Sequence, residues 1–145
     1  MSKLYKSSVD SREELCEELV KLKDNANVKL KEALPVIRKL TSKKIADIEN
    51  PEVDCKVSDV LLYLQMCGEY MTISLYDDDY VDDMVQLRKF FKEARKDAEL
   101  SIVDIAKKSR VSSTVIERFI YNNGNLKVSD FFKITNALGI VVEIG

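Results

Sequence analysis

The sequence predicts a mainly α-helical protein made of two similar units in tandem, each ending in a short β-strand. The main observation is an internal repeat: residues 56–75, KVSDVLLYLQMCGEYMTISL, resemble residues 127–145, KVSDFFKITNALGIVVEIG. The shift that carries Lys56 onto Lys127, called the repeat shift below, aligns the two segments without a gap and brings Gly68 onto Gly139. In both segments apolar residues have helical spacing before the glycine and a short apolar or alternating run after it. The pattern therefore indicates a repeated helix–glycine–strand unit.

Each repeated helix is expected to begin at a serine, Ser58 or Ser129, whose side-chain oxygen can cap the free N–H groups of the first turn. The glycine after each helix can take the positive φ that ends it. Strands are then expected at 70–75, YMTISL, and at 140–144, IVVEI. Because single strands have unpaired edges, we expect these two to pair with each other or with the same strands of a second chain.

The repeat shift also aligns residues 30–50 with residues 101–121, and their apolar positions coincide. In the later segment the pattern predicts a helix near 102–108, a tight turn at Ser109 and Arg110, and a second helix capped by Ser112. Two short helices joined by a turn of three or four residues form a helix-turn-helix, whose second helix offers polar residues to DNA.

The segment LSIVDIAKKSRVSSTVIERFI followed by KVSDFFKITNALGIVVEI resembles the phage-repressor-type (Xre-like) helix-turn-helix family over about residues 84–145. TSKKIADIEN followed by VSDVLLYLQMCGEYMTISL resembles the same family and extends the likeness over about residues 30–75. The resemblance implies two tandem lambda-repressor-like helix-turn-helix domains, each followed by a short β-strand. They are residues 1–76, the divergent first copy, and residues 77–145, the second copy, joined through the acidic stretch YDDDYVDD at 76–83.

The sequence departs from this family in the turn and in the first helix of the motif. Ser109, and Arg38 in the first copy, stand where the family commonly has glycine, which takes positive φ most easily. Pro35 aligns with Ala106, inside a helix, where proline would remove a backbone hydrogen bond. Either that helix begins at Pro35, or the first copy has drifted from the family geometry.

The resemblance assigns DNA contacts to the outer face of the helix after the turn and to the loop that follows it. Arg118 is the main candidate, since a guanidinium can bridge guanine edges or hold a phosphate. Glu117 is better explained as a surface charge, and Arg118 is explained equally well in that way. Loop polarity equally explains the asparagines, and a solvated helix face the basic stretch RKLTSKK. The full set of candidates is Ser112, Ser113, Thr114, Glu117, Arg118, Asn122 and Asn123 in the second copy, and Lys39, Ser42, Lys43 and Lys44 in the first.

The composition gives no support for an enzyme. The 145 residues contain no histidine and only four glycines, so the commonest general base and the glycine-rich phosphate loops are missing. The three cysteines, Cys16, Cys55 and Cys67, lack zinc-type spacing and are expected to be reduced and partly buried. We expect no enzyme activity, no cofactor and no metal.

The charge and hydropathy patterns predict a cytoplasmic protein with a small acidic excess. No apolar run is long enough for a membrane span, and residues 1–15 lack the apolar core of a signal peptide. The net charge is −2, and acidic residues gather at 13–18 and 77–83, away from both expected DNA-contacting helices. This segregation leaves one face available for DNA.

The sequence-based hypothesis is a sequence-specific regulator that binds double-stranded DNA, a repressor of prophage, mobile-element or antitoxin type. The two copies would act as an intramolecular pseudo-dimer, or two chains would form a homodimer through their C-terminal strands. The alternative is a protein-interaction module, antitoxin-like or an anti-repressor, that keeps the scaffold without binding DNA. Its partner would be a toxin or a phage protein, and Pro35, the turns without glycine and the acidic balance favour it.

Overall fold

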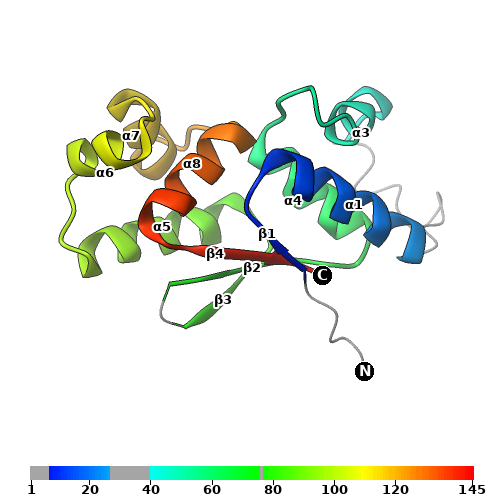
Figure 1. The fold of residues 1–145 in the computed structure, drawn as a ribbon, viewed down its shortest axis with the longest axis horizontal. Coiled ribbons are helices and arrows are strands. Elements are labelled where there is room, and N and C mark those ends of the chain that lie inside the picture. The colour runs from blue at the N-terminus through cyan, green and yellow to red at the C-terminus, as the bar shows by residue number, and fades with distance from the viewer. Residues whose placement is uncertain (1–6, 27–39, 76) are drawn as a thin grey trace.

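The computed structural model describes residues 7–26, 40–75 and 77–145, which are mainly helical with one small antiparallel sheet (Figure 1). Pro35, Arg38 and Lys39 lie outside the described residues. The described elements are β1 (Ser7–Val9), α1 (Arg12–Ala26), α3 (Ser42–Ile48), α4 (Val57–Met66), β2 (Met71–Ser74), β3 (Asp78–Val81), α5 (Met84–Asp97), α6 (Ile102–Ser109), α7 (Ser113–Tyr121), α8 (Val128–Leu138) and β4 (Val141–Ile144).

The sheet has the order β1-β4-β2-β3, and all its neighbouring strands are antiparallel. Its centre is the pairing of β2 with β4, so the expected pairing of the two repeated strands is present within one chain. The helices lie on one side of the sheet in Figure 1. Alternate strand residues point toward them. These buried inner residues are Val9, Met71, Ile73, Val81, Val142 and Ile144.

The acidic stretch at 76–83 is more than a connection between the copies, which corrects the sequence-based expectation. Residues 78–81 form β3 and pair with β2, and buried Val81 stands opposite Met71. Asp78 and Asp79 remain exposed at the edge of the sheet. Pairing with β2 and the burial of Val81 hold this strand in the sheet despite its charge.

Two pairs of equivalent residues face each other and define a local two-fold axis between the copies. In the sheet, Thr72 stands opposite Glu143, its counterpart under the repeat shift. On the far side of the helices, Lys56 stands opposite Lys127 in an isolated antiparallel bridge. A residue that faces its own counterpart lies beside the axis. The axis therefore runs from the middle of the sheet to this bridge, and the copies are arranged like the subunits of a two-fold dimer.

Reciprocal backbone hydrogen bonds join the copies at the bridge. The Val57 N–H donates to the Leu126 carbonyl at 2.9 Å, and the Val128 N–H donates to the Cys55 carbonyl at 2.8 Å. Each bond is the counterpart of the other under the repeat shift, so the two-fold relation extends to individual atoms.

The helices α4 and α8 begin before the serines that the sequence suggested as caps. Their N-cap residues are Lys56 and Lys127, so the expectation for Ser58 and Ser129 is wrong. The helices start earlier because the first N–H of each one is bonded to a carbonyl of the other copy. Each serine hydroxyl instead forms a hydrogen bond with a residue of the other copy. Ser58 Oγ accepts a 2.6 Å hydrogen bond from Asn125, and Ser129 Oγ donates one of 2.6 Å to Asp54.

The repeat also extends to α1 and α5, which the sequence aligns poorly. The Asp10 N–H donates to the Glu14 side chain, and the Asp82 N–H donates to the Gln86 side chain. Asp10 and Asp82 stand one position further apart in the chain than the repeat shift requires, so an ungapped comparison hides the likeness of these two contacts.

A single apolar core spans both copies. In the second copy it is aromatic: the Phe91 ring lies edge-on to Phe119 at 5.4 Å and to Phe131 at 6.2 Å, between ring centroids. The two predicted domains, 1–76 and 77–145, thus share both a sheet and a core.

We expect Phe91→Ala to lower the free energy of unfolding by about 3–5 kcal/mol, because it removes a ring that is 2% exposed and leaves a cavity between α5, α7 and α8. Urea unfolding measures the change. The control is Val85→Ala on the same helix, where the side chain is 71% exposed and the expected change is within about 0.5 kcal/mol. A loss below about 1 kcal/mol for Phe91→Ala would contradict this account of the core.

Candidate nucleic-acid interface

The helices α3 and α7 are equivalent under the repeat shift and lie near opposite ends of the molecule (Figure 1). Both lie on the side away from the sheet, with the starts of α4 and α8, which the Lys56–Lys127 bridge joins, between them. The side that carries α3, the bridge and α7 is called the bridge face below. It contains the described candidates for DNA contact from both copies.

The helix before α7 is held by a reciprocal cap at its start. The Asp104 N–H donates to Ser101 Oγ at 3.0 Å, and the Ser101 N–H donates to the Asp104 carboxylate at 2.9 Å. The hydrogen bond from the Ser101 backbone lowers the pKa of Asp104. This cap satisfies two donors that a helix start leaves free, and so fixes where α6 begins.

The turn between α6 and α7 lies at Arg110, the second of the two residues at which the sequence predicted it. Arg110 takes the left-handed conformation, with φ of +62°, which costs a non-glycine residue about 1–2 kcal/mol. Ser109 is the last residue of α6 and is buried, so the expectation that it occupies the glycine position of the turn is wrong. Its hydroxyl donates to the Ile105 carbonyl at 2.7 Å and accepts the Val111 N–H at 3.3 Å. These two contacts keep Ser109 inside the bend.

The helix α7 has one buried and one exposed face. Ile116, Phe119 and Ile120 are buried against the rest of the second copy. The four residues Ser113, Thr114, Glu117 and Arg118, called the α7 outer face below, are all exposed. Ser112, Asn122 and Asn123 are exposed as well. Ser112 is the N-cap residue, as expected, but its side chain makes no capping bond, so its hydroxyl is available to an external acceptor.

In the first copy the two candidate lysines that the structure describes, Lys43 and Lys44, are exposed but paired with acids. Ser42 is exposed at the start of α3, and Lys43 and Lys44 follow it. Lys43 lies 3.2 Å from Asp47, and Lys44 lies 3.4 Å from Asp59. Such pairs are weak in water, but they reduce the net positive charge on this part of the bridge face.

An arginine fixes the end of α7 and the loop that follows. Arg88 of α5 donates from Nε to the Phe119 carbonyl at 2.9 Å and from Nη2 to the Gly124 carbonyl at 3.0 Å. The Gly124 N–H in turn donates to the Arg118 carbonyl at 2.8 Å. A Cβ at position 124 would lie 3.0 Å from backbone atoms of Arg118, so this close return of the loop favours glycine.

The first copy uses the same carbonyls with an arginine from another position. Arg12 donates from Nη2 to the Ile48 carbonyl at 2.7 Å and from Nε to the Val53 carbonyl at 3.1 Å. Its Nη2 also lies 3.0 Å from the carbonyls of Asp47 and Asn50. Ile48 and Val53 are the counterparts of Phe119 and Gly124 under the repeat shift. Both helices of the bridge face are therefore held at their C-terminal ends by a guanidinium.

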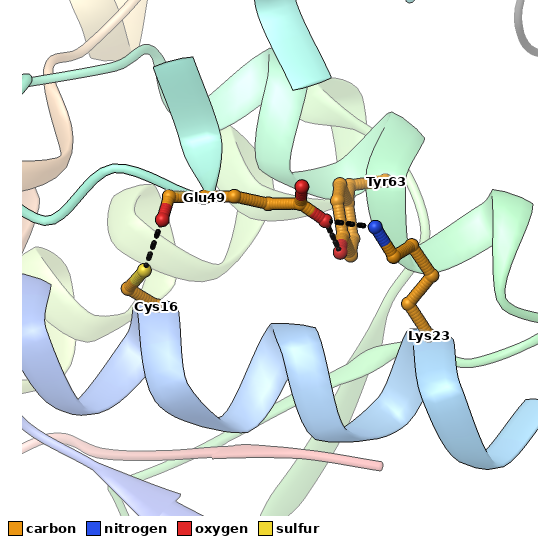
Figure 2. Close-up of polar contacts among 4 residues, drawn as sticks. All are labelled: Cys16, Lys23, Glu49 and Tyr63. Atoms are coloured by element: carbon orange, nitrogen blue, oxygen red, sulfur yellow. Dashed lines mark hydrogen bonds and ion pairs between the residues drawn. The ribbon is translucent and has the colours of Figure 1, made fainter. Parts of the chain in front are cut away.

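A cluster of polar side chains also contacts the C-terminal end of α3 (Figure 2). Glu49, the C-cap of α3, accepts hydrogen bonds from Lys23 and from the Tyr63 hydroxyl, the latter at 2.6 Å, while Cys16 donates to its carbonyl at 3.0 Å. Burial, and then the hydrogen bond to Glu49, raise the pKa of Tyr63 above its ordinary range. The second copy has Ile134 in place of Tyr63, so this cluster belongs to the first copy alone.

Lys56 and Lys127 are the candidates that the sequence analysis missed. Both are exposed on the bridge face and lie beside the axis. Within the described part of the chain, neither is within ion-pair distance of an acid. Their signal was present in the sequence, because each opens a KVSD repeat, but only the fold brings them together.

The described residues hold no group of three or more histidine, cysteine or acidic side chains arranged for a metal ion. Nor do they include a helix with the length and apolar character needed to cross a membrane. Comparisons with protein families, with curated proteins and with solved structures gave no match.

We expect Arg88→Ala to reduce the free energy of unfolding by about 2 kcal/mol, because two carbonyls lose a charged donor. Arg88→Lys should recover only part of this loss, since an ammonium lacks the fork that reaches both carbonyls. The control is Lys89→Ala on the same helix, where the side chain is exposed. Equal effects of Arg88→Ala and Lys89→Ala in urea unfolding would rule out a stabilising role for the Arg88 hydrogen bonds.

Tyr63→Phe is expected to change how stability depends on alkaline pH. Because the folded state raises the pKa of Tyr63, the phenol contributes stability that is fully present below its ordinary value of 10.0 and is lost as pH rises beyond it. Wild type should therefore lose stability relative to Tyr63→Phe above about pH 10. Urea unfolding of both proteins from pH 7 to 11 tests this, and parallel curves would contradict it.

Proposed function

We propose that this protein is a sequence-specific regulator that binds double-stranded DNA through its bridge face. In this proposal α6 and α7 form a helix-turn-helix, and the α7 outer face enters the major groove. The observation that carries the proposal is that α7 follows a tight turn, buries one face and exposes Ser113, Thr114, Glu117 and Arg118 on the other. α3 would have the same role in the first copy, giving two tandem units of this kind.

The side chains of the second copy suit a nucleic acid. Arg118 carries a guanidinium that can make paired hydrogen bonds to a guanine edge or a phosphate. Ser113 and Thr114 lie in the first turn of α7, where hydroxyl and N–H donors suit a phosphate oxygen. Lys107 and Lys108, in the last turn of α6, add exposed positive charge close to the turn.

The position of the acidic strand supports this proposal, although the acidic first turn of α1 lies beside the end of α3, whose carbonyls Arg12 and Cys16 contact. The acidic strand β3 lies at the edge of the sheet, on the side opposite α3 and α7 (Figure 1). A phosphate backbone at the bridge face would therefore be far from this acidic strand, and long-range repulsion from it would be screened beyond about 10 Å at 0.1 M salt. The small net negative charge of the chain does not prevent binding on such a face.

The resemblance to phage repressors extends the proposal to a repressor of prophage, mobile-element or antitoxin type that acts in the cytoplasm. The second candidate function is a protein-interaction module, antitoxin-like or an anti-repressor, whose partner is a toxin or a phage protein. The pairing of Lys43 with Asp47 and of Lys44 with Asp59 favours it, because these acids lower the positive charge that α3 offers to phosphates. The two functions differ in whether the purified chain selects DNA.

Selection from a random double-stranded DNA library tests the proposal directly. A regulator should enrich one motif, and its affinity for that motif should fall steeply with salt as phosphate counterions are released. An interaction module should enrich none, and that result would contradict DNA recognition.

Arg118→Ala should weaken binding to the selected motif by about 10- to 100-fold, the cost of one bidentate base contact. Its effect on random DNA should be smaller, since a single phosphate contact contributes less than base recognition. Lys89→Ala is the control, because Lys89 is exposed on α5 beside β3 residues Asp79 and Tyr80. Fluorescence anisotropy with both DNAs measures the effect, and equal losses for the two variants would argue against α7 as the reading helix.

A further inference from the structure

The two copies offer different chemistry on the bridge face although they are related by a two-fold axis. The α7 outer face corresponds, in order, to Ser42, Lys43, Ala46 and Asp47 of α3. Only the serine is the same. At the last position the second copy has the guanidinium of Arg118 and the first copy has a carboxylate, Asp47.

The two faces also have a fixed relation to each other. Two backbone hydrogen bonds of 2.8–2.9 Å and the side-chain bonds Ser58–Asn125 and Ser129–Asp54, each 2.6 Å, join the copies near the bridge. At the other end of the axis β2 and β4 share a sheet, and the core is continuous. The chain therefore presents both helices without a second protein molecule.

Resting on the function proposed above, we propose that one chain covers an operator with two unlike half-sites and binds it in one orientation. The α7 outer face reads base edges in one half-site. α3 holds mainly the phosphate backbone in the other.

The division of roles follows from the side chains. Arg118 can make a planar pair of hydrogen bonds, which discriminates between bases. Lys43 is a point charge whose side chain is 85% exposed, so it suits a phosphate and selects bases weakly. Asp47 would repel phosphates, and the ammonium of Lys43, 3.2 Å away, offsets part of this repulsion. A homodimer would repeat one chemistry in both half-sites, whereas this chain cannot.

In this proposal Lys56 and Lys127 contact the DNA midway between the two half-sites. They stand opposite each other across the bridge, where like charges are unfavourable. A phosphate backbone near the axis would offset that repulsion for both side chains. Two half-sites about one helical turn of DNA apart, roughly 34 Å, would place the bridge over the base pairs between them.

Stoichiometry and motif shape provide the first test. Library selection followed by light scattering of the complex should give one chain per site and a motif with a strong half and a weak half. A palindromic motif occupied by two chains would overturn this inference and leave the proposed DNA binding intact. Absence of any enriched motif would overturn both.

Orientation is tested by cleavage from a single attached iron chelate. Glu117→Cys and Ala46→Cys place the probe on α7 and α3, at equivalent exposed positions that carry no positive charge. The unsubstituted protein is the control: its cysteines are 5–8% exposed, and burial raises the pKa of Cys55 and Cys67 to about 11, so they should label poorly. We expect the α7 probe to cut beside the strong half only and the α3 probe beside the weak half only. Cuts by each probe on both sides would overturn the single orientation.

Discussion

The backbone pairing across the local two-fold axis is the constraint on which the rest of this structure depends. The N–H groups of Val57 and Val128 bind carbonyls of the opposite copy, and this sets where α4 and α8 begin. The same axis passes between Thr72 and Glu143, so the pairing register of β2 with β4 obeys the same two-fold relation as α4 and α8. A slip in register at either place would turn the inner strand residues away from the core. The two ends of the axis therefore reinforce each other.

The two copies reach the same geometry with different side chains. Arg12 and Arg88 hold equivalent carbonyls from different positions. When Asp10 is aligned with Asp82, Arg88 falls on Cys16, one helical turn beyond Arg12. A helix leaves its last carbonyls without hydrogen-bond partners. In both copies an arginine supplies the missing donors. The core side chains of the two copies differ. The first has the buried Tyr63 and its partner Glu49 where the second has an apolar and aromatic core.

Much of the fold was accessible from the sequence because the repeat carries its own alignment. The apolar spacing predicted α6 and α7. The repeat predicted that residues 70–75 would pair either with residues 140–144 or with a second chain, and the first of these is found. The caps were misplaced because a serine cap competes with a backbone partner from the other copy, which lies far along the chain and which local sequence does not reveal. For the same reason the sequence did not reveal the hydrogen bonds of Arg12 and Arg88 to helix-end carbonyls, or that Lys56 faces Lys127. All depend on which segments the fold brings together.

Joining two copies in one chain changes what a two-fold arrangement can recognise. In a homodimer, each substitution appears in both half-sites, so recognition stays symmetric. Here, the contacts near the axis preserve symmetry while the outer faces differ, as with Asp47 and Arg118. The scaffold needs the symmetry because backbone pairing is reciprocal, but the surface does not. A face that remains two-fold in geometry and is asymmetric in chemistry suits a target whose two halves have the same spacing and different sequences.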